Sequence, residues 1–320
     1  MKKQKKRNKL ISVLIILTLA LGLVACEPDA PSASGSGNVS AEESLPTVDP
    51  SGAQIKVPEE ISSIVVLAPS IAETVIALGD GDKIVAYDTQ SAGLEGLPAD
   101  KLVFDLVSPD MEQLAALNPD LLLVTNLSLY DEENPYQQLI DLGVCVACIP
   151  SSDSIADIQS DVAFIAAVLG KSAKGEELIA QMQAEIDEIT AVAQNITDKK
   201  TVYFEISAAP YMYSFGTGVF LNEMIQLIGA ENILADQEGW LSVGEESVVA
   251  ANPDVILTNV NYIDNPTQEI MERSGWNALT AVQNGDVYYI DNMASSLPDQ
   301  NVVKAMRQMA EAVYPEYYGQ

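Results

Sequence analysis

One segment of this chain occurs twice, and that repeat limits the possible folds more than any other feature. Residues 111–123 read Met-Glu-Gln-Leu-Ala-Ala-Leu-Asn-Pro-Asp-Leu-Leu-Leu, and residues 245–257 read Glu-Glu-Ser-Val-Val-Ala-Ala-Asn-Pro-Asp-Val-Ile-Leu. Each copy predicts a short helix that ends at Asn-Pro-Asp and is followed at once by an aliphatic strand. A helix-turn-strand unit repeated once at a large spacing indicates two similar lobes. Two lobes enclose a cleft between them, which is where small ligands bind.

The N-terminus predicts export and a lipid anchor. Lysines and one arginine precede an uncharged stretch, 10–25, that is short for a membrane-spanning helix. The stretch ends in Leu-Val-Ala-Cys, which resembles the bacterial lipobox and implies cleavage before Cys26 and a diacylglycerol on its sulfur. We therefore predict a lipoprotein signal peptide over 1–26 and an extracytoplasmic protein anchored to the outer face of the cell membrane. An ordinary signal peptide and an uncleaved anchor are the alternatives.

Residues 27–52 predict a flexible tether, because they consist mainly of Ser, Ala, Gly, Pro and acidic residues and contain no aromatic side chain. The remaining chain is long enough for two domains with their own cores.

The exported chain is strongly acidic. Six of the 16 basic residues lie in the first 26 residues, so 10 basic residues face 46 acidic ones, a net charge of −36. This charge disfavours nucleic acid and anionic lipid surfaces as partners. Cations, neutral ligands or a basic protein partner are favoured.

Cys145 and Cys148 have the Cys-x-x-Cys spacing of redox and zinc sites. They lie in an aliphatic stretch typical of a strand, where residues three apart point to opposite faces. The chain contains no histidine and no second cysteine pair. Buried core cysteines are therefore favoured over a disulfide or a metal site, and no metal or cofactor is expected.

Alternating aliphatic and helical stretches predict an α/β fold. The N-terminal α/β lobe is predicted over 53–152, and the first helix is expected to begin with a capping box formed by Ser70 and Glu73. A helical bridge over 153–197 contains one long helix near 172–195, too long for a crossover within one lobe. The C-terminal α/β lobe is predicted over 198–320. The fold class is thus two Rossmann-like α/β lobes joined by a single long α-helix.

The chain resembles the substrate-binding lipoproteins of ABC importers for iron complexes and cobalamin across nearly all of residues 60–314. The resembling stretches, taken together in their order and spacing, are Ile64–Thr74, Asn118–Asp120, Gly229–Ile233, Asn252–Asp254 and Gly275–Tyr288. The resemblance implies two lobes with limited hinge motion, a metal chelate as cargo, and an ABC permease dimer with its ATPase as the partner. We expect the protein itself to be a monomer and not an enzyme.

In that family one glutamate on each lobe forms salt bridges with arginines of the permease. The matching residues are Glu112 and Glu246, which are also related by the repeat. Two carboxylates related by pseudo-symmetry suit two basic pockets related by a two-fold axis. Ordinary acidic residues in a first helical turn are the alternative.

The family implies that loops after the strands line the ligand cleft. The ligand-binding candidates are Ser70, Tyr87, Asp88, Leu106, Tyr213, Phe215, Trp240 and Tyr262. Trp240 matches a wall tryptophan of the cobalamin binders, whereas Leu106 replaces another one.

Charge and residue type narrow the cargo. Anionic ferric catecholates require several arginines, and the exported chain has only Arg273 and Arg307, both in predicted helices. Without histidine, haem and bare zinc or manganese are poor candidates. A corrinoid such as cobalamin, or a ferric hydroxamate siderophore, remains.

A surface-anchored carboxylate-dependent hydrolase and an adhesin on the same scaffold are the competing functions. The absence of histidine excludes Ser-His-Asp and Cys-His catalysis, and no phosphate-binding Gly-rich motif is present. No pair of acidic residues stands out from the acidic background.

Overall fold

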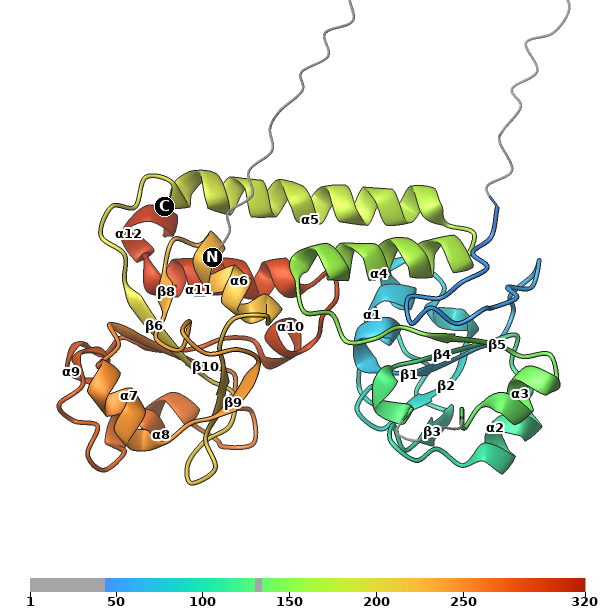
Figure 1. Cartoon of the computed structure of the whole chain (residues 1–320), viewed down its shortest axis with the longest axis horizontal. Coiled ribbons are helices and arrows are strands. Elements are labelled where there is room, and N and C mark those ends of the chain that lie inside the picture. The colour runs from blue at the N-terminus through green and yellow to red at the C-terminus, as the bar shows by residue number, and fades with distance from the viewer. Residues whose placement is uncertain (1–43, 130–133, 320) are drawn as a thin grey trace, which may run out of the picture. The chain divides into compact units, whose positions relative to one another are not determined.

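The computed structural model describes residues 44–129 and 134–319. The predicted signal peptide, Cys26 and residues 27–43 lie outside the described residues. The described residues form one compact unit that contains two parallel sheets. We call the unit built on β1–β5 the N-lobe and the unit built on β6–β11 the C-lobe (Figure 1).

The N-lobe is a parallel five-stranded sheet in the order β3-β2-β1-β4-β5. Its strands are β1 Ile64–Leu67, β2 Ile84–Asp88, β3 Leu102–Phe104, β4 Leu121–Val124 and β5 Cys145–Cys148. Its helices are α1 Pro69–Ala77, α2 Met111–Leu117 and α3 Gln137–Asp141, with short 3-10 turns at Gly81–Lys83 and Asn126–Ser128. The central strands β1 and β4 are buried on both faces, which explains their unbroken aliphatic sequences.

The C-lobe is a parallel four-stranded sheet in the order β11-β10-β6-β8, with a separate two-stranded antiparallel sheet of β7 and β9. Its strands are β6 Thr201–Glu205, β7 Tyr213–Phe215, β8 Glu231–Asn232, β9 Trp240–Ser242, β10 Val255–Thr258 and β11 Val287–Tyr289. Its helices are α6 Phe220–Leu227, α7 Glu245–Ala251, α8 Pro266–Glu272, α9 Thr280–Asn284, α10 Asn292–Ser296, α11 Val302–Val313 and α12 Pro315–Tyr318.

The sequence repeat corresponds to a repeat of structure. Strands β2-β1-β4-β5 and β8-β6-β10-β11 have the same order, and the helix before β4 or β10 ends at an asparagine with a positive φ, 43° at Asn118 and 47° at Asn252. Two residues later, Asp120 accepts bonds from the backbone and side chain of Ser63, and Asp254 does the same from Thr201. The predicted pair of related α/β lobes is confirmed.

Two helices connect the lobes, rather than one. The predicted long helix is present as α5 Ser172–Ala193, about 33 Å at 1.5 Å per residue. Beside it lies α4 Ile155–Val168 (Figure 1). Ile158 of α4 is buried in the C-lobe core and Ile165 in the N-lobe core, so α4 also belongs to both lobes.

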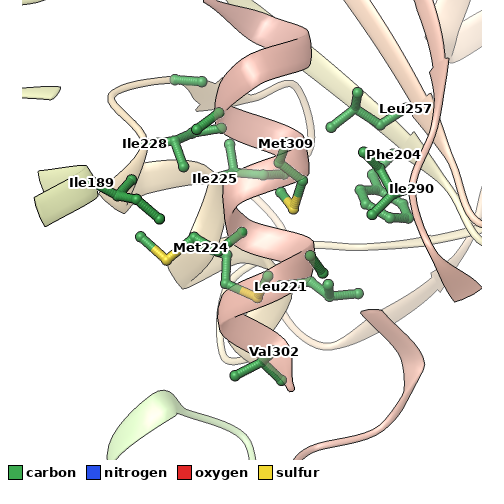
Figure 2. Close-up of a cluster of buried hydrophobic side chains, with 14 of the residues drawn as sticks. Ile189, Phe204, Leu221, Met224, Ile225, Ile228, Leu257, Ile290, Val302 and Met309 are labelled. Carbon is green, nitrogen blue, oxygen red and sulfur yellow. The ribbon is translucent and has the colours of Figure 1, made fainter. Parts of the chain in front are cut away.

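The core of the C-lobe forms around α11. Figure 2 shows α11 between Ile189 of α5 and the strand residues Phe204 and Leu257. Met309 on α11 is fully buried in this cluster. The long connecting helix is therefore part of the C-lobe core and does not merely cross its surface.

Two predictions about local structure are wrong. Helix α1 begins at Pro69 after Ala68, without a side-chain cap, because proline fits the first helical position; Ser70 is already helical and forms no capping box with Glu73. The tether was predicted to extend to residue 52, but the buried carboxylate of Asp49 accepts a 2.8 Å hydrogen bond from the backbone N–H of Cys148. Residues 48–54 are thereby held on the N-lobe.

The two cysteines are buried and free, on opposite faces of the N-lobe sheet as predicted. Burial raises the pKa of each thiol to about 11. Both therefore stay protonated at neutral pH, as core residues do.

Candidate functional site

A cavity of about 340 Å³ lies where the N-lobe strands end at their carboxyl termini. Residues that follow each of the five N-lobe strands line it, which is the usual place for a ligand in an open parallel sheet. These residues are Ala68–Ile71 after β1, Gln90 after β2, Leu106 after β3, Thr125 and Leu127 after β4, and Ile149–Ser152 after β5. We call this space the interlobe cavity.

The C-lobe closes the other side of the interlobe cavity with Asn292 and Met293 of α10 and with residues 296–298. The Asn292 side chain donates a 2.6 Å hydrogen bond to the backbone carbonyl of Asn259, which fixes its position after β10. Asp291 caps α10 by accepting from the backbone N–H of Ala294. The C-lobe wall is therefore a single short helix held at its start.

The lobes also meet beside the cavity. The hydroxyl of Thr74 on α1 lies 3.1 Å from Oε1 of Gln300, and Gln300 Nε2 donates to the carbonyl of Glu73. These contacts join α1 of the N-lobe to the start of α11.

Asp161 of α4 is the single charged side chain among the described residues that line the interlobe cavity. The hydroxyl of Ser152 donates a 2.6 Å hydrogen bond to its Oδ2. Burial raises the pKa of Asp161 to about 6, despite the opposing effect of that bond. The remaining lining consists of aliphatic side chains and uncharged hydroxyl and amide groups.

The predicted ligand residues fall into three groups. Ser70 and Leu106 line the interlobe cavity. Tyr87, Asp88 and Phe215 are 4%, 0% and 0% exposed, so their selection as ligand residues is corrected. Tyr87 and Phe215 pack in the lobe cores, and Asp88 turns back to accept hydrogen bonds from Gln90 and Ser91. The sequence pattern predicts that these residues lie at strand ends, but it does not show that their side chains are buried in the lobes.

Tyr213, Trp240 and Tyr262 form the third group and are exposed on the C-lobe. Tyr213 and Trp240 lie on the paired strands β7 and β9, and the Trp240 ring packs edge to face on Phe215. The hydroxyl of Tyr262 accepts a 2.8 Å bond from the backbone N–H of Ala208, next to the Ser207 that pairs with Tyr213. The two-stranded sheet of β7 and β9 and its neighbouring loop thus connect these three aromatic residues.

Neither arginine lies in the cavity lining. Arg273 is buried, forms two bonds of 2.7 and 2.9 Å with Glu205, also pairs with Glu269, and stacks 4.3 Å from the Trp276 ring. Arg307 faces Glu185 and Glu188 on α5. Both arginines have structural partners.

Glu112 and Glu246 are exposed, and each is the second residue of its helix, α2 or α7. Within residues 44–129 and 134–319, neither carboxylate has a hydrogen bond or a salt bridge to another side chain. Both are therefore accessible to a partner.

Sequence reasoning missed Asp161, Ser152 and the α10 wall. A signal for Asp161 was present, because it stands three residues after Ile158 and four before Ile165, beside the apolar stripe of its helix. A carboxylate at such a position requires a partner or a cavity. The α10 wall gave no comparable signal, since it depends on how the lobes meet.

The comparisons with known proteins agree with this architecture. The family model described as periplasmic binding protein matches residues 64–294. An uncharacterized ABC transporter substrate-binding lipoprotein of Bacillus subtilis is 28% identical, over 98% of this chain and 99% of its own. A cobalamin-binding protein of Halobacterium salinarum is 25% identical, over 95% of this chain and 83% of its own.

Among solved structures, a possible iron-binding periplasmic solute-binding protein of Staphylococcus epidermidis has a TM-score of 0.69 at 25% identity. The similarity covers 80% of this chain and 100% of that one. The hydrolase and adhesin alternatives gain no support from these matches. Because the family model spans both parallel sheets and most of the chain, the resemblance predicted from the motifs is confirmed: the chain belongs to the periplasmic binding protein family.

Proposed function

We propose that this protein is the ligand-capturing component of an ABC importer and that it carries a neutral or cationic metal chelate in the interlobe cavity. The observation that supports the proposal most directly is the lining of the cavity. Among the described residues, the lining combines aliphatic side chains with hydroxyl and amide groups and contains Asp161 but no lysine or arginine. An anionic chelate would find no counter-charge among these residues.

A corrinoid is the first candidate for the cargo and a ferric hydroxamate is the second. The relative from Halobacterium salinarum is named a cobalamin-binding protein, and the structure from Staphylococcus epidermidis a possible iron-binding protein. A cavity of about 340 Å³ is small for a whole corrinoid. We propose that the exposed Tyr213, Trp240 and Tyr262 contact the part of the chelate that extends beyond the cavity.

The docking surface for the permease is proposed to include Glu112 and Glu246. They occupy equivalent positions on the repeat-related helices α2 and α7, and both side chains are exposed. Two equivalent carboxylates, one on each lobe, match a permease dimer whose two subunits present equivalent basic pockets.

The proposed location is the outer face of the cell membrane, with Cys26 carrying the lipid. The relative from Bacillus subtilis is named a lipoprotein, and the N-terminal sequence has the features of a lipoprotein signal. In the described part of the chain, no helix has the length and hydropathy of a membrane span.

Ligand-induced thermal stabilisation tests the binding function. Cyanocobalamin, cobinamide, ferrichrome, ferrioxamine B and haem are each added to the purified protein at a large excess. Binding at about 100 times Kd adds about 2.7 kcal/mol to the free energy of unfolding, so Tm should rise by several degrees with a corrinoid or a hydroxamate. A Tm that none of these chelates changes contradicts the proposal.

Charge reversal tests the docking surface separately. We expect Glu112→Lys and Glu246→Lys each to reduce uptake of the bound chelate by cells at least roughly tenfold, with unchanged Kd of the purified protein. Glu176→Lys is the matched control, because Glu176 is exposed on α5, away from both repeat helices. Reduced chelate affinity in either docking variant would contradict the assignment.

A further inference from the structure

The interlobe cavity has a strong asymmetry of charge. Among the residues that the structure describes, its lining holds one carboxylate, that of Asp161, and no basic side chain to neutralise it. Several basic side chains in the described residues already have an acidic partner: Lys171 pairs with Asp80, Arg273 with Glu205 and Lys304 with Asp291. No salt bridge of the described residues involves Asp161. A carboxylate in a mainly apolar cavity, without a cation, interacts favourably with a positive group that enters.

Asp161 retains an unused acceptor. Ser152 donates to Oδ2, whereas within residues 44–129 and 134–319 no backbone or side-chain group donates to Oδ1. The Asp161 side chain is half-buried, and its Oδ1 is not fully enclosed by protein atoms. Ser152 thus fixes one oxygen and leaves the other for a group in the cavity.

We propose that Asp161 is a specificity-determining residue that accepts a hydrogen bond from a cationic group of the cargo, such as a pendant ammonium or a water bound to a cationic metal centre. The inference rests on the proposed function and narrows it: among chelates of equal size, the protein selects those with a positive group. Ser152 acts as a positioning residue by orienting the carboxylate of Asp161.

The geometry also gives this selection a dependence on pH. Among the described residues, the other acidic group that acts on Asp161 is Asp157, one turn earlier on α4, and its effect is smaller than that of burial. Ser152, which donates to Asp161, and the other described residues that line the cavity are uncharged. Because burial brings the pKa of Asp161 to about 6, the carboxylate is ionised at pH 7 and mostly protonated at pH 5. Affinity for a cationic chelate should therefore rise with pH across this range.

A matched pair of probes tests the proposal. Ferrioxamine B carries a free ammonium group, and N-acetyl ferrioxamine B has the same ferric core without it; aquacobalamin and cyanocobalamin form a second pair, cationic and neutral. We measure Kd by isothermal titration at pH 5, 6 and 7. At pH 7 the wild-type protein should bind the cationic member of a pair roughly tenfold or more tightly, as a charge-assisted hydrogen bond predicts.

Three variants separate the charge of Asp161 from its structural role. Asp161→Asn should reduce the preference to less than about twofold and remove its pH dependence. Ser152→Ala keeps the charge and should keep a preference above about threefold. Glu176→Gln removes one exposed charge from α5 and should leave the preference unchanged. Circular dichroism confirms that each variant is folded.

The outcomes distinguish this inference from the proposed function. If the protein binds both members of a pair equally, or if Asp161→Asn retains the preference, the inference is overturned and the proposed function stands. If Ser152→Ala loses the preference as completely as Asp161→Asn, loop packing and not charge sets it, and the inference is again overturned. If none of the four chelates binds, the inference is overturned; if cobinamide and ferrichrome also fail to bind, the proposed function is overturned as well.

Discussion

The carboxyl ends of the central strands differ between the two lobes, although the lobes share one topology. Asp120 bonds to Ser63 before β1 and Asp254 bonds to Thr201 at the start of β6, so Leu67 at the end of β1 is equivalent to Glu205 at the end of β6. Leu67 is an aliphatic core residue, whereas Glu205 is buried and paired with Arg273. In the N-lobe this edge of the sheet is apolar, and the loops beyond it surround a cavity. In the C-lobe the same edge carries a buried ion pair.

The difference indicates how a duplicated fold can bind one ligand asymmetrically. Five N-lobe strand ends contribute to the interlobe cavity, and the C-lobe contributes α10 and residues 296–298. The ion pair of Glu205 and Arg273 holds α8 against β6 and thereby stabilises the C-lobe. The N-lobe thus supplies most of the lining of the interlobe cavity, and the C-lobe closes one side of it.

The strongest test of this comparison is to remove the ion pair. Arg273→Met leaves Glu205 buried without its cation, and we expect the free energy of unfolding to fall by about 3–5 kcal/mol. Glu205→Leu combined with Arg273→Met gives the C-lobe the apolar edge that Leu67 gives the N-lobe, and should recover most of the loss. Urea unfolding followed by tryptophan fluorescence measures both. A loss below about 1 kcal/mol in Arg273→Met would show that the pair does not stabilise the C-lobe edge.

The two helix-ending asparagines provide a second, smaller test. Both have positive φ, so replacement by alanine should cost about 1 kcal/mol of strain at either site. Asn252 also exchanges two 2.8 Å hydrogen bonds with Thr280, and Asn118 makes no side-chain bond within the described residues. We therefore expect Asn252→Ala to cost about 2 kcal/mol and Asn118→Ala about 1 kcal/mol in urea unfolding.

Substitution by glycine separates the cost of backbone strain from the cost of losing the side-chain hydrogen bonds, because glycine adopts positive φ without strain. Asn118→Gly should be close to neutral, whereas Asn252→Gly should still lose the bonds to Thr280. Equal costs for the two glycine variants would contradict this account.

The smallest effect concerns the aspartates that follow these asparagines. Asp120 accepts four hydrogen bonds from Ser62 and Ser63, which lower the pKa of its carboxyl group below the usual 3.8. Since the pKa is lower in the folded protein than in the unfolded chain, the stabilisation is present above about pH 4 and is lost as pH falls through the folded value. Asp120→Asn should cost up to about 1 kcal/mol at pH 6 and clearly less at pH 3, by urea unfolding at both pH values.

Asp254→Asn is the matched C-lobe variant. Asp254 accepts two bonds from Thr201, so the variant should show a smaller loss at pH 6. A loss that is the same at both pH values for Asp120→Asn would show that its charge state does not matter.

Much of the fold follows from local sequence patterns. The aliphatic strands, the Asn-Pro-Asp helix ends and the apolar stripe of α5 each have a period or a stop signal that can be recognised without coordinates. The role of α4 as a second connection was not recognised, because its apolar residues form a single stripe and nothing local shows that Ile158 and Ile165 enter different cores.

The candidate site was predictable only in part. Ser70 and Leu106 follow strand ends and line the cavity, as topology suggests. Tyr87 and Asp88 also lie at a strand end, but whether a side chain points outward depends on sheet twist and on local hydrogen bonds such as those that Ser91 donates to the Asp88 carboxylate. Asn292 and Met293 reach the cavity through the packing of the two lobes, which no short sequence pattern encodes.

Because α4 supplies side chains to two hydrophobic cores at once, neither half of the globular unit is complete without it. Cutting the chain anywhere between the halves would leave one of them with exposed aliphatic surface. Denaturation of the two lobes should accordingly proceed as one cooperative event.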